Sequence, residues 1–351
     1  MRLKDAVLKV VKTAGGFTLM RASRWRRRRL MILCYHGVSV DDQHEWDPAF
    51  YVTQDHLRDR LRMLVNGGYT ILPLAEATRR LYDGTLPARS VAITFDDGAA
   101  DFATHALPVL REFNVPVTLY LSTYYCFVRL PVFDTMLSYV MWRGRNSGGD
   151  LRHVCEVAEP VPVKTDEQHE HAFELIQAVV ARTNLNAEEK NALLPRVAAA
   201  LGVDYEDIQR RELLTLMSPE VVRSLPSDIV DVQLHTHRHR TPRDRALFVS
   251  EIVDNIAAIH QIRGAELPLE HFCYPSGDYY GEFLPWLRET GVKYATTCVP
   301  EIASPDTDPL LIPRLIDSMN HSELAFESWV SGFAMLLPRR SEYRLDALRL
   351  Q

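Results

Sequence analysis

Two adjacent carboxylates, Asp96 and Asp97, follow the apolar run 91–95 and are followed in turn by Gly98. The run is rich in residues that favour β-strands, and it is predicted to be a buried strand whose carboxyl end delivers both acids into a loop. Because neighbouring carboxylates repel each other and are costly to bury together, we expect a cation beside them, most simply a metal ion.

Three histidines at alternate positions, His235, His237 and His239, follow a second apolar run at 229–234. His235 and His239 face the same way if the chain turns helically after the strand, whereas His237 then points away. Neutral imidazole is the commonest nitrogen ligand of zinc and similar metals. Two imidazoles and one carboxylate make a metal site with open positions for water and substrate, and a charged loop without a metal is the alternative.

These residues share a placement, since four predicted strands end in polar or loop-forming residues. The ends are His36, the acidic pair 96–97, His235 and the turn 275–277. Parallel α/β folds gather their sites at the carboxyl ends of strands. The common placement therefore favours one site built from all four ends.

Strands and helices are predicted to alternate over the first 120 residues and again after residue 229, which favours a parallel sheet or barrel. The strands are expected at residues 30–35, 69–72, 90–95, 115–121, 229–234, 271–274, 293–297 and 311–315. Residues 127–226 break this rhythm and are predicted to be a largely helical insertion into an α/β body at 30–337. Residues 338–351 are predicted to be a polar tail.

The net charge of −6 on the 351 residues hides an asymmetry. Residues 1–29 hold ten Lys or Arg and one Asp, so the rest of the chain is acidic and no nucleic-acid partner is expected. The segment is predicted to be either a solvated, partly helical tail or an amphipathic helix on a membrane surface. With no signal peptide and no run of about 18 apolar residues, we expect a cytoplasmic protein, with peripheral attachment to the inner face of the membrane as an alternative.

The order of these motifs resembles that of the polysaccharide deacetylase family, also called the NodB-homology or carbohydrate esterase 4 family. The resemblance rests on the TFDDG stretch at 94–98 and the H-T-x-x-H stretch at 235–239, each after a predicted strand. The stretches 35–38 and 272–277 also resemble members of the family. The resemblance implies a distorted (β/α)7-like, TIM-like barrel that uses a divalent metal to remove acetyl groups from N-acetylated sugars.

The family's motif positions imply a division of roles in this chain. Asp97, His235 and His239 would hold one divalent metal ion, with zinc expected first and cobalt, manganese or nickel as alternatives. Asp96 would be the general base, which takes a proton from water. The backbone N–H of Ser276, in the turn that resembles the family's third motif, is a candidate oxyanion donor.

The sequence departs from the family pattern at two places. The third motif commonly carries an arginine that orients the base, and Cys273 stands there instead. Arg314, near a late strand, is expected either to supply this charge or to form an ordinary salt bridge. The late Leu-x-His motif, which supplies the general acid, is not evident; His36 resembles the position that takes this role in part of the family, and we prefer it over His321.

The sequence therefore predicts a metal-dependent hydrolase that deacetylates an N-acetylated sugar in a polysaccharide, oligosaccharide or lipid-linked glycan, within cell-envelope glycan biosynthesis. One alternative is a catalytically impaired, deacetylase-like protein that binds glycan or acts as a scaffold. A second alternative is a glycoside hydrolase, although its two acids must flank the scissile bond, and adjacent residues are poorly placed for that.

Overall fold

The computed structural model describes residues 3–337, so the predicted polar tail at 338–351 lies outside the described residues. The chain divides into two compact units. Unit 1 combines Met1–Tyr124 with Pro219–Gln351, and unit 2 is Tyr125–Ser218. The candidate site residues named above all belong to unit 1.

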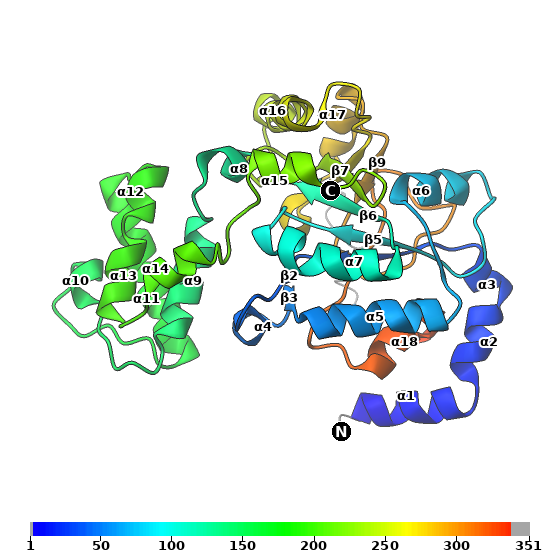
Figure 1. Cartoon of the computed structure of the whole chain (residues 1–351), viewed down its shortest axis with the longest axis horizontal. Coiled ribbons are helices and arrows are strands. Elements are labelled where there is room, and N and C mark those ends of the chain that lie inside the picture. Colours follow the sequence, from blue (N-terminus) through cyan, green and yellow to red (C-terminus); the bar gives the residue numbers. More distant parts are fainter. Residues whose placement is uncertain (1–2, 338–351) are drawn as a thin grey trace. The chain divides into compact units, whose positions relative to one another are not determined.

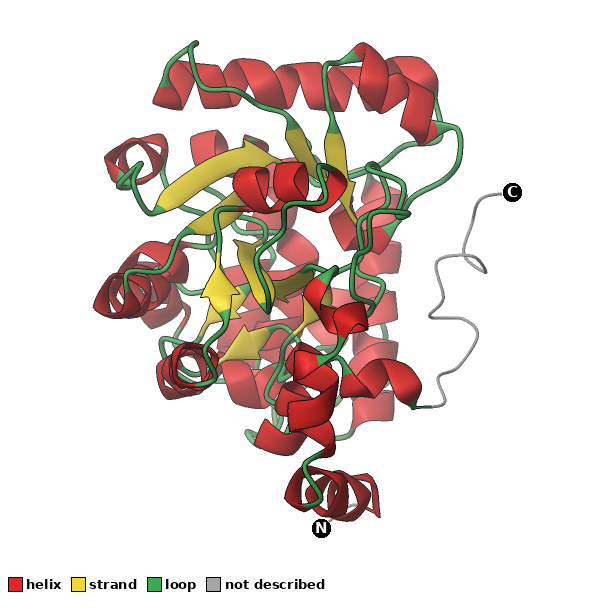
Figure 2. Ribbon diagram, turned by 90° about the vertical axis from the view of Figure 1, so that its right-hand side faces the viewer, coloured by secondary structure: helices red, strands yellow, loops and turns green. Residues whose placement is uncertain are grey.

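Unit 1 is built on one sheet of parallel strands that curls into an incomplete barrel (Figure 1, Figure 2). The strands are β1 (Met31–Tyr35), β4 (Thr70–Ile71), β5 (Ser90–Phe95), β6 (Val117–Leu121), β7 (Val230–Leu234), β8 (His271–Cys273), β9 (Tyr294–Thr296) and β10 (Leu315–Ile316). Their order is β10-β1-β5-β6-β7-β8-β9, and β4 pairs with β5 outside this path. A parallel bridge between Thr296 and Ile312 links β9 to the segment before β10. The predicted (β/α)7-like barrel is confirmed.

Strands β1 and β5 lie side by side and fix the position of the first candidate residues. Their register pairs Cys34 with Thr94 and Tyr35 with Phe95. Every residue of both strands is buried, as expected for parallel strands that are covered on both faces. The register therefore brings the residues that follow the two strands to the same edge of the sheet.

Helices cover the sheet of unit 1 (Figure 1). They include α5 (Gln54–Asn66), α6 (Leu74–Tyr82), α7 (Leu107–Phe113), α15 (Pro219–Ser224), α16 (Arg245–Arg263), α17 (Phe283–Glu289) and α18 (Glu323–Ser331). In α5, the Thr53 hydroxyl accepts a hydrogen bond from the backbone N–H of His56 at 3.0 Å and caps the first turn. Leu57, Leu61 and Leu64 recur at helical spacing and are buried, so this face of α5 lies on the core.

The N-terminal segment forms three helices, α1 (Leu3–Thr13), α2 (Gly16–Ala22) and α3 (Arg24–Arg27). Both α1 and α2 contact α18. Arg26 is fully buried and donates hydrogen bonds to the backbone oxygens of Val330 (2.9 Å), Arg29 (2.8 Å) and Ser90 (3.2 Å). The segment is therefore not a solvated tail, because part of its basic run is bound inside unit 1. No helix in residues 3–337 is both long enough and apolar enough to cross a bilayer.

Unit 2 is made of helices, as predicted for the insertion (Figure 1). They are α9 (Phe133–Arg143), α10 (Arg152–Cys155), α11 (Asp166–Thr183), α12 (Ala187–Asn191), α13 (Leu194–Ala200) and α14 (Tyr205–Arg210). Helix α9 contacts α11, α12 and α13. It buries Met136, Leu137 and Val140, and α11 buries Ile176, so this unit has an apolar core of its own.

Candidate active site

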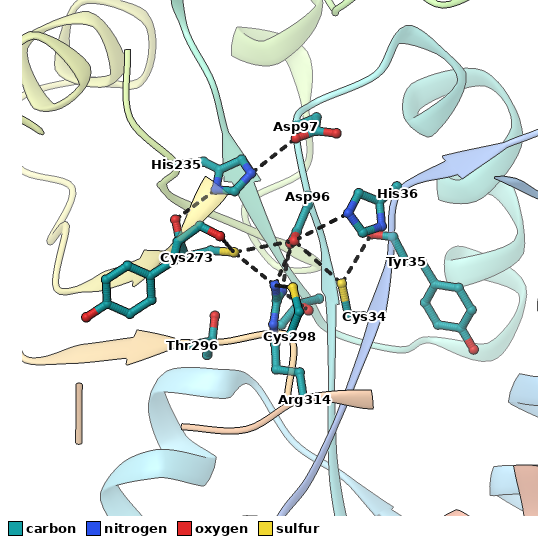
Figure 3. A network of polar contacts seen from close by, with 12 residues as sticks. Cys34, Tyr35, His36, Asp96, Asp97, His235, Cys273, Thr296, Cys298 and Arg314 are labelled. Atoms are coloured by element: carbon teal, nitrogen blue, oxygen red, sulfur yellow. Dashed lines mark hydrogen bonds and ion pairs between the residues drawn. The ribbon is translucent and has the colours of Figure 1, made fainter. Parts of the chain in front are cut away.

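The carboxyl ends of three strands bring four polar residues together at one edge of the sheet (Figure 3). His36 follows β1, Asp96 and Asp97 follow β5, and His235 follows β7. The η2 turn (Pro275–Gly277) follows β8 after a single residue. In the strand order, β1 is next to β5 and β7 is next to β8, with β6 between the two pairs.

Asp97 contacts two histidines. Its Oδ1 lies 3.1 Å from Nε2 of His235 and 3.1 Å from Nε2 of His239. One ligand atom from each of the three residues lies within 4.8 Å of the other two. Asp97 itself has a left-handed φ of 70°, which turns its side chain out of the strand direction directly before Gly98.

The chain after β7 does not turn helically, so this part of the prediction is wrong. Thr236 and His239 have left-handed φ values of 62° and 53°, which no right-handed helix contains. The Thr236 hydroxyl accepts a hydrogen bond from the backbone N–H of Arg240 at 3.1 Å and closes the turn. His235 and His239 face Asp97 through this irregular turn instead.

Hydrogen bonding determines which ring nitrogen of His235 can bind a metal. Its Nδ1 lies 2.9 Å from the backbone oxygen of Cys273. A carbonyl oxygen only accepts, so Nδ1 carries the proton and Nε2 presents a lone pair to Asp97. An imidazole lone pair and a carboxylate oxygen at 3.1 Å repel each other unless a cation or a proton lies between them. The three side chains therefore fit a divalent metal ion.

His237 lies outside this group. Its Nδ1 is 2.8 Å from the hydroxyl of Thr123, and its backbone N–H donates to the Glu251 oxygen at 3.0 Å. The side chain thus contacts the element after β6, and it is not in the group formed by Asp97, His235 and His239.

Arg314 forms a bidentate ion pair with Asp96 (Figure 3). Its Nη1 and Nη2 lie 2.7 Å from Oδ1 and 2.7 Å from Oδ2 of the carboxylate. Nη1 also donates to the Thr94 hydroxyl (2.9 Å), and Nε donates to the Thr297 oxygen (3.1 Å). Arg314 is 0% exposed and Asp96 is 2% exposed, so solvent screens this pair little. Arg314 is the residue directly before β10. In the strand order, β10 lies at one end of the sheet and β8 lies near the other end.

Three thiols surround this ion pair, and sequence reasoning did not predict these contacts. Cys34 and Cys273 place their Sγ atoms 3.5 Å and 3.4 Å from Asp96 Oδ2, and Cys298 Sγ lies 3.7 Å from Arg314 Nη2. All are free cysteines. The small Cys273 side chain lies 2.9 Å from Arg314 Nη2, where the family commonly carries the arginine itself. The only sequence signal was the position of Cys34 and Cys273 near strand ends.

The pKa of Asp96 reflects two opposed effects. Burial would raise the pKa of this carboxyl, but the contact with Arg314 outweighs burial and holds the pKa well below its usual range. Asp96 is therefore an ionised, oriented carboxylate near neutral pH.

His36 lies beside Asp96, as the sequence interpretation requires of a general acid. Its Nε2 is 3.8 Å from Asp96 Oδ2, and its ring meets the edge of Phe50 at a centroid distance of 4.7 Å. Burial lowers the pKa of His36. The ring of Phe50 is 42% exposed and borders the candidate site, a contact that sequence reasoning missed.

A short pairing of strands holds the residues after His36. In it, β2 (Gly37–Val38) pairs with β3 (Tyr51–Val52), and a side-chain Cβ at Gly37 would lie 2.2 Å from the Tyr51 ring. The backbone N–H of Val38 donates to Asp101 Oδ1 at 2.9 Å. Burial raises the pKa of Asp101 to about 7. These contacts fix the direction in which the chain leaves β1.

His321 does not join the group around Asp96. Its Nδ1 lies 3.4 Å from Asp317 Oδ1, in a buried cluster that also holds His56 and Arg60. Of the two candidate acids, the structure therefore places only His36 next to the acidic pair.

Ser276 occupies a turn with a left-handed φ of 57°. Hydrogen bonds from Gly277 N–H to the Tyr274 oxygen and from Asp278 N–H to the Pro275 oxygen close this turn. The described contacts of Ser276 do not include the acidic pair, so its role as an oxyanion donor stays a prediction.

Comparison with known families agrees with this geometry. The family model described as polysaccharide deacetylase matches residues 83–129, a stretch that contains β5, Asp96 and Asp97. This part of the chain is therefore similar to the polysaccharide deacetylase family. The matched stretch does not reach His235, His239 or Arg314, so the contacts of these residues are known from the geometry alone.

One curated relative is the Poly-beta-1,6-N-acetyl-D-glucosamine N-deacetylase of Escherichia coli (strain K12). It is 27% identical over 100 residues, which is 28% of this chain and 15% of the relative. The chain thus aligns with far less than two thirds of that protein.

Solved structures of deacetylases share the fold over 86% of this chain. The deacetylase PplD of Streptococcus pyogenes, in complex with acetate, has a TM-score of 0.56 at 16% identity over 98% of its own chain. IcaB from Ammonifex degensii has a TM-score of 0.54 at 16% identity over 97% of its chain. At this level of identity, the likeness shows the fold alone.

Proposed function

We propose that the chain is a metal-dependent hydrolase that removes acetyl groups from an N-acetylated sugar in a polysaccharide, oligosaccharide or lipid-linked glycan. The observation that carries the proposal is the unequal environment of two neighbouring carboxylates. Asp96 is paired with Arg314 at 2.7 Å, while Asp97 faces two imidazoles at 3.1 Å. One acid is thus available for proton transfer and the other for holding a cation. Cell-envelope glycan biosynthesis is the setting we expect.

Asp97, His235 and His239 would hold one divalent ion, for which zinc suits a site of two imidazoles and one carboxylate. Cobalt, manganese and nickel accept the same ligands. When bound, such an ion lowers the pKa of water and polarises a carbonyl group. The proton on Nδ1 of His235, held by the Cys273 carbonyl, keeps Nε2 free as the ligand atom.

Asp96 would act as the general base. Arg314 occupies one lone pair on each carboxylate oxygen and fixes the plane of the carboxylate, so a remaining lone pair can accept a proton from the attacking water. The same contact makes Asp96 a weaker base. Orientation is therefore the main contribution of Arg314 in this proposal.

His36 would supply the proton that the leaving group needs from its imidazolium form, which is the minority form at neutral pH because burial lowers the pKa of His36. The water oxygen bonds to the acetyl carbon as Asp96 takes its proton, the C–N bond breaks, and the amine nitrogen leaves with a proton from His36. The products are acetate and a free amino sugar. The backbone N–H of Ser276 would donate to the oxyanion that forms on the acetyl group.

Two rival functions are less well supported. A glycoside hydrolase needs two carboxyl groups that flank the bond, about 5–10 Å apart, whereas Asp96 and Asp97 are adjacent and Asp96 is bound to Arg314. A non-catalytic scaffold was suggested by the missing third-motif arginine, and the contact between Arg314 and Asp96 removes the main reason for it.

Membrane contact through residues 1–29 and a cytoplasmic location stay predictions from the sequence. Val7 and Val10 of α1 are 49% and 69% exposed and are the apolar side chains that such a contact would use.

The proposal is tested by measuring acetate release from N-acetylglucosamine oligomers, peptidoglycan fragments and lipid-linked precursors. We expect release from at least one substrate, loss of release with a chelator, and recovery when zinc is added. Release of new reducing ends without acetate would instead support a glycoside hydrolase. Tight glycan binding by metal-replete protein without acetate release would support the scaffold.

A further inference from the structure

Unit 2 contains two neighbouring cavities of about 640 Å³ and 300 Å³. Both are lined by Arg129, Leu130, Pro131, Tyr205 and Gln209, so they are two parts of one cleft. Cavities that bind small molecules usually measure about 300–1,000 Å³. All of the lining residues lie in unit 2, so the cleft belongs to the helical insertion alone.

Tyr205 is the central residue of this cleft. It lines both cavities, and its side chain is 9% exposed. Burial raises the pKa of this phenol to about 12, so it keeps its proton at neutral pH. The phenol can therefore donate a hydrogen bond to a ligand in the cleft.

Other polar groups face the same cleft. Gln209 lies four residues after Tyr205 in α14, on the same face of the helix, and lines both cavities. Asn191 lines the larger cavity, and its side-chain Oδ1 is buried without a partner in the described part of the chain. A phenol and two carboxamides offer donors as well as acceptors. Such a set suits a ligand that carries hydroxyl and amide groups.

Apolar and acidic side chains make up most of the remaining lining. Met136 and Leu216 line the smaller cavity, beside Pro131. Arg129 is the one cation among the lining residues, and its charge is already paired with Glu212 at 2.5 Å. A phosphate-bearing ligand would find no free positive charge here. A neutral or amine-bearing ligand with apolar faces fits better.

We propose that this cleft binds a hexosamine oligosaccharide, which is a further stretch of the glycan that unit 1 deacetylates. Pyranose rings combine an apolar face with hydroxyl groups, and they therefore match the mixed lining around Tyr205. This inference rests on the proposed function, since it takes the substrate class from it. Binding in unit 2 raises the effective concentration of a long glycan at unit 1, so long substrates gain more than short ones.

The test compares full-length wild-type protein with Tyr205→Phe and with the double variant Tyr205→Phe/Gln209→Ala. Calorimetric titrations use metal-stripped protein, so that no turnover occurs. The three probes are hexamers of N-acetylglucosamine, of glucosamine and of glucose. We expect one or both hexosamine hexamers to bind, about tenfold more weakly to the double variant, because two neutral hydrogen bonds are lost. The acetylated and free-amine probes distinguish whether the cleft holds substrate or product.

The matched control is Gln177→Ala, which removes a glutamine of unit 2 that lines neither cavity. We expect unchanged binding in this control and unchanged acetate release from a disaccharide in all variants. Equal binding by wild-type protein and the double variant would overturn the proposal, as would equal binding of the glucose hexamer. If wild-type protein releases no acetate from any substrate, the proposed function fails, whereas the loss of binding in the double variant still reports on the cleft.

Discussion

The pairing of Asp96 with Arg314 shows how much a single residue of the site depends on its partner. Residue types and spacing were enough to select Asp96, Asp97 and His235. They could not decide whether Arg314 meets the base, because that contact depends on strand order. The contacts of Cys34 and Cys273 with Asp96 were not predicted for the same reason, since nothing local in the sequence shows that two distant thiols lie beside one carboxylate.

Replacing Arg314 tests this partner directly. Arg314→Ala is expected to lower kcat for acetate release by at least about 100-fold, because Asp96 loses the group that orients it. It should also lower the free energy of unfolding by about 3–5 kcal/mol, because a buried carboxylate is left unpaired. Metal content, measured by mass spectrometry, should stay near that of the wild type.

A second variant keeps this prediction informative if Arg314→Ala folds poorly. The double variant Arg314→Ala/Cys273→Arg returns the arginine to the place where the family commonly carries it, and should recover part of the lost activity and stability. Full activity in Arg314→Ala alone would show that the ion pair has no part in catalysis.

The choice between the two candidate acids is a further residue-scale question. His36→Ala is expected to lower kcat by about 100-fold while the protein keeps its metal, because the leaving nitrogen loses its proton donor. His321→Ala, whose side chain contacts Asp317 instead, serves as the control and should change kcat little. A larger loss of kcat in His321→Ala than in His36→Ala would reverse the assignment.

At the scale of elements, apolar runs were sufficient to predict the strands of the main sheet, although not their ends, and the short pair of β2 and β3 was not predicted. The run predicted at 311–315 contributes only a bridge at Ile312 before β10 begins at Leu315. Arg314, directly before β10, is buried, and its side chain contacts Asp96. A helical turn after β7 was the arrangement considered for the two histidines, but Thr236 and His239 have left-handed conformations. Threonine is β-branched and rarely adopts this conformation, so its residue type gave no signal of the turn.

Asp317 joins three elements and should control stability in acid. Its carboxylate accepts hydrogen bonds from Tyr35 Oη (3.1 Å) and Arg60 Nε (2.9 Å) and lies 3.1 Å from Nε2 of His56. Burial would raise the pKa of Asp317, but contacts with His321, His56 and Arg60 outweigh it and hold the pKa well below its usual range.

Because the pKa of Asp317 is lower in the folded protein than in the unfolded chain, its ionised carboxylate stabilises the fold. This stabilisation is complete above the usual pKa of an Asp carboxyl, and it is lost progressively as the pH falls from there toward the pKa of the folded state. Unfolding by urea at pH 7, 4 and 3 should show wild-type stability falling below about pH 4. Asp317→Asn should be less stable by about 3 kcal/mol at pH 7 and should lose less on acidification. Parallel pH curves for the two proteins would contradict the role of Asp317.

The buried arginine of the N-terminal helices leads to a second prediction at this scale. Arg26→Ala is expected to lower the free energy of unfolding by about 3 kcal/mol, because three backbone oxygens lose a charged donor. Arg27→Ala, which removes an exposed neighbour, should be neutral in the same denaturation measurement. Equal effects of the two substitutions would mean that the basic run acts only through its charge.

At the scale of the whole molecule, the sequence was sufficient to predict an α/β barrel with a helical insertion. Hydrophobic periodicity and the order of the motifs carry that information along the chain. Four successive arginines look alike in the sequence, so the burial of Arg26 could not be predicted. The cleft around Tyr205 could not be predicted from the sequence either, because the residues that line it are about 80 positions apart in the chain.

The central claim is that the two neighbouring acids have different tasks, and metal content measured together with acetate release tests it most directly. Purified protein is expected to carry about one divalent ion per chain. Asp96→Asn should keep this ion and lose acetate release, whereas Asp97→Asn should lose both. Wild-type metal content in Asp97→Asn, or loss of the metal in Asp96→Asn alone, would contradict the division of roles.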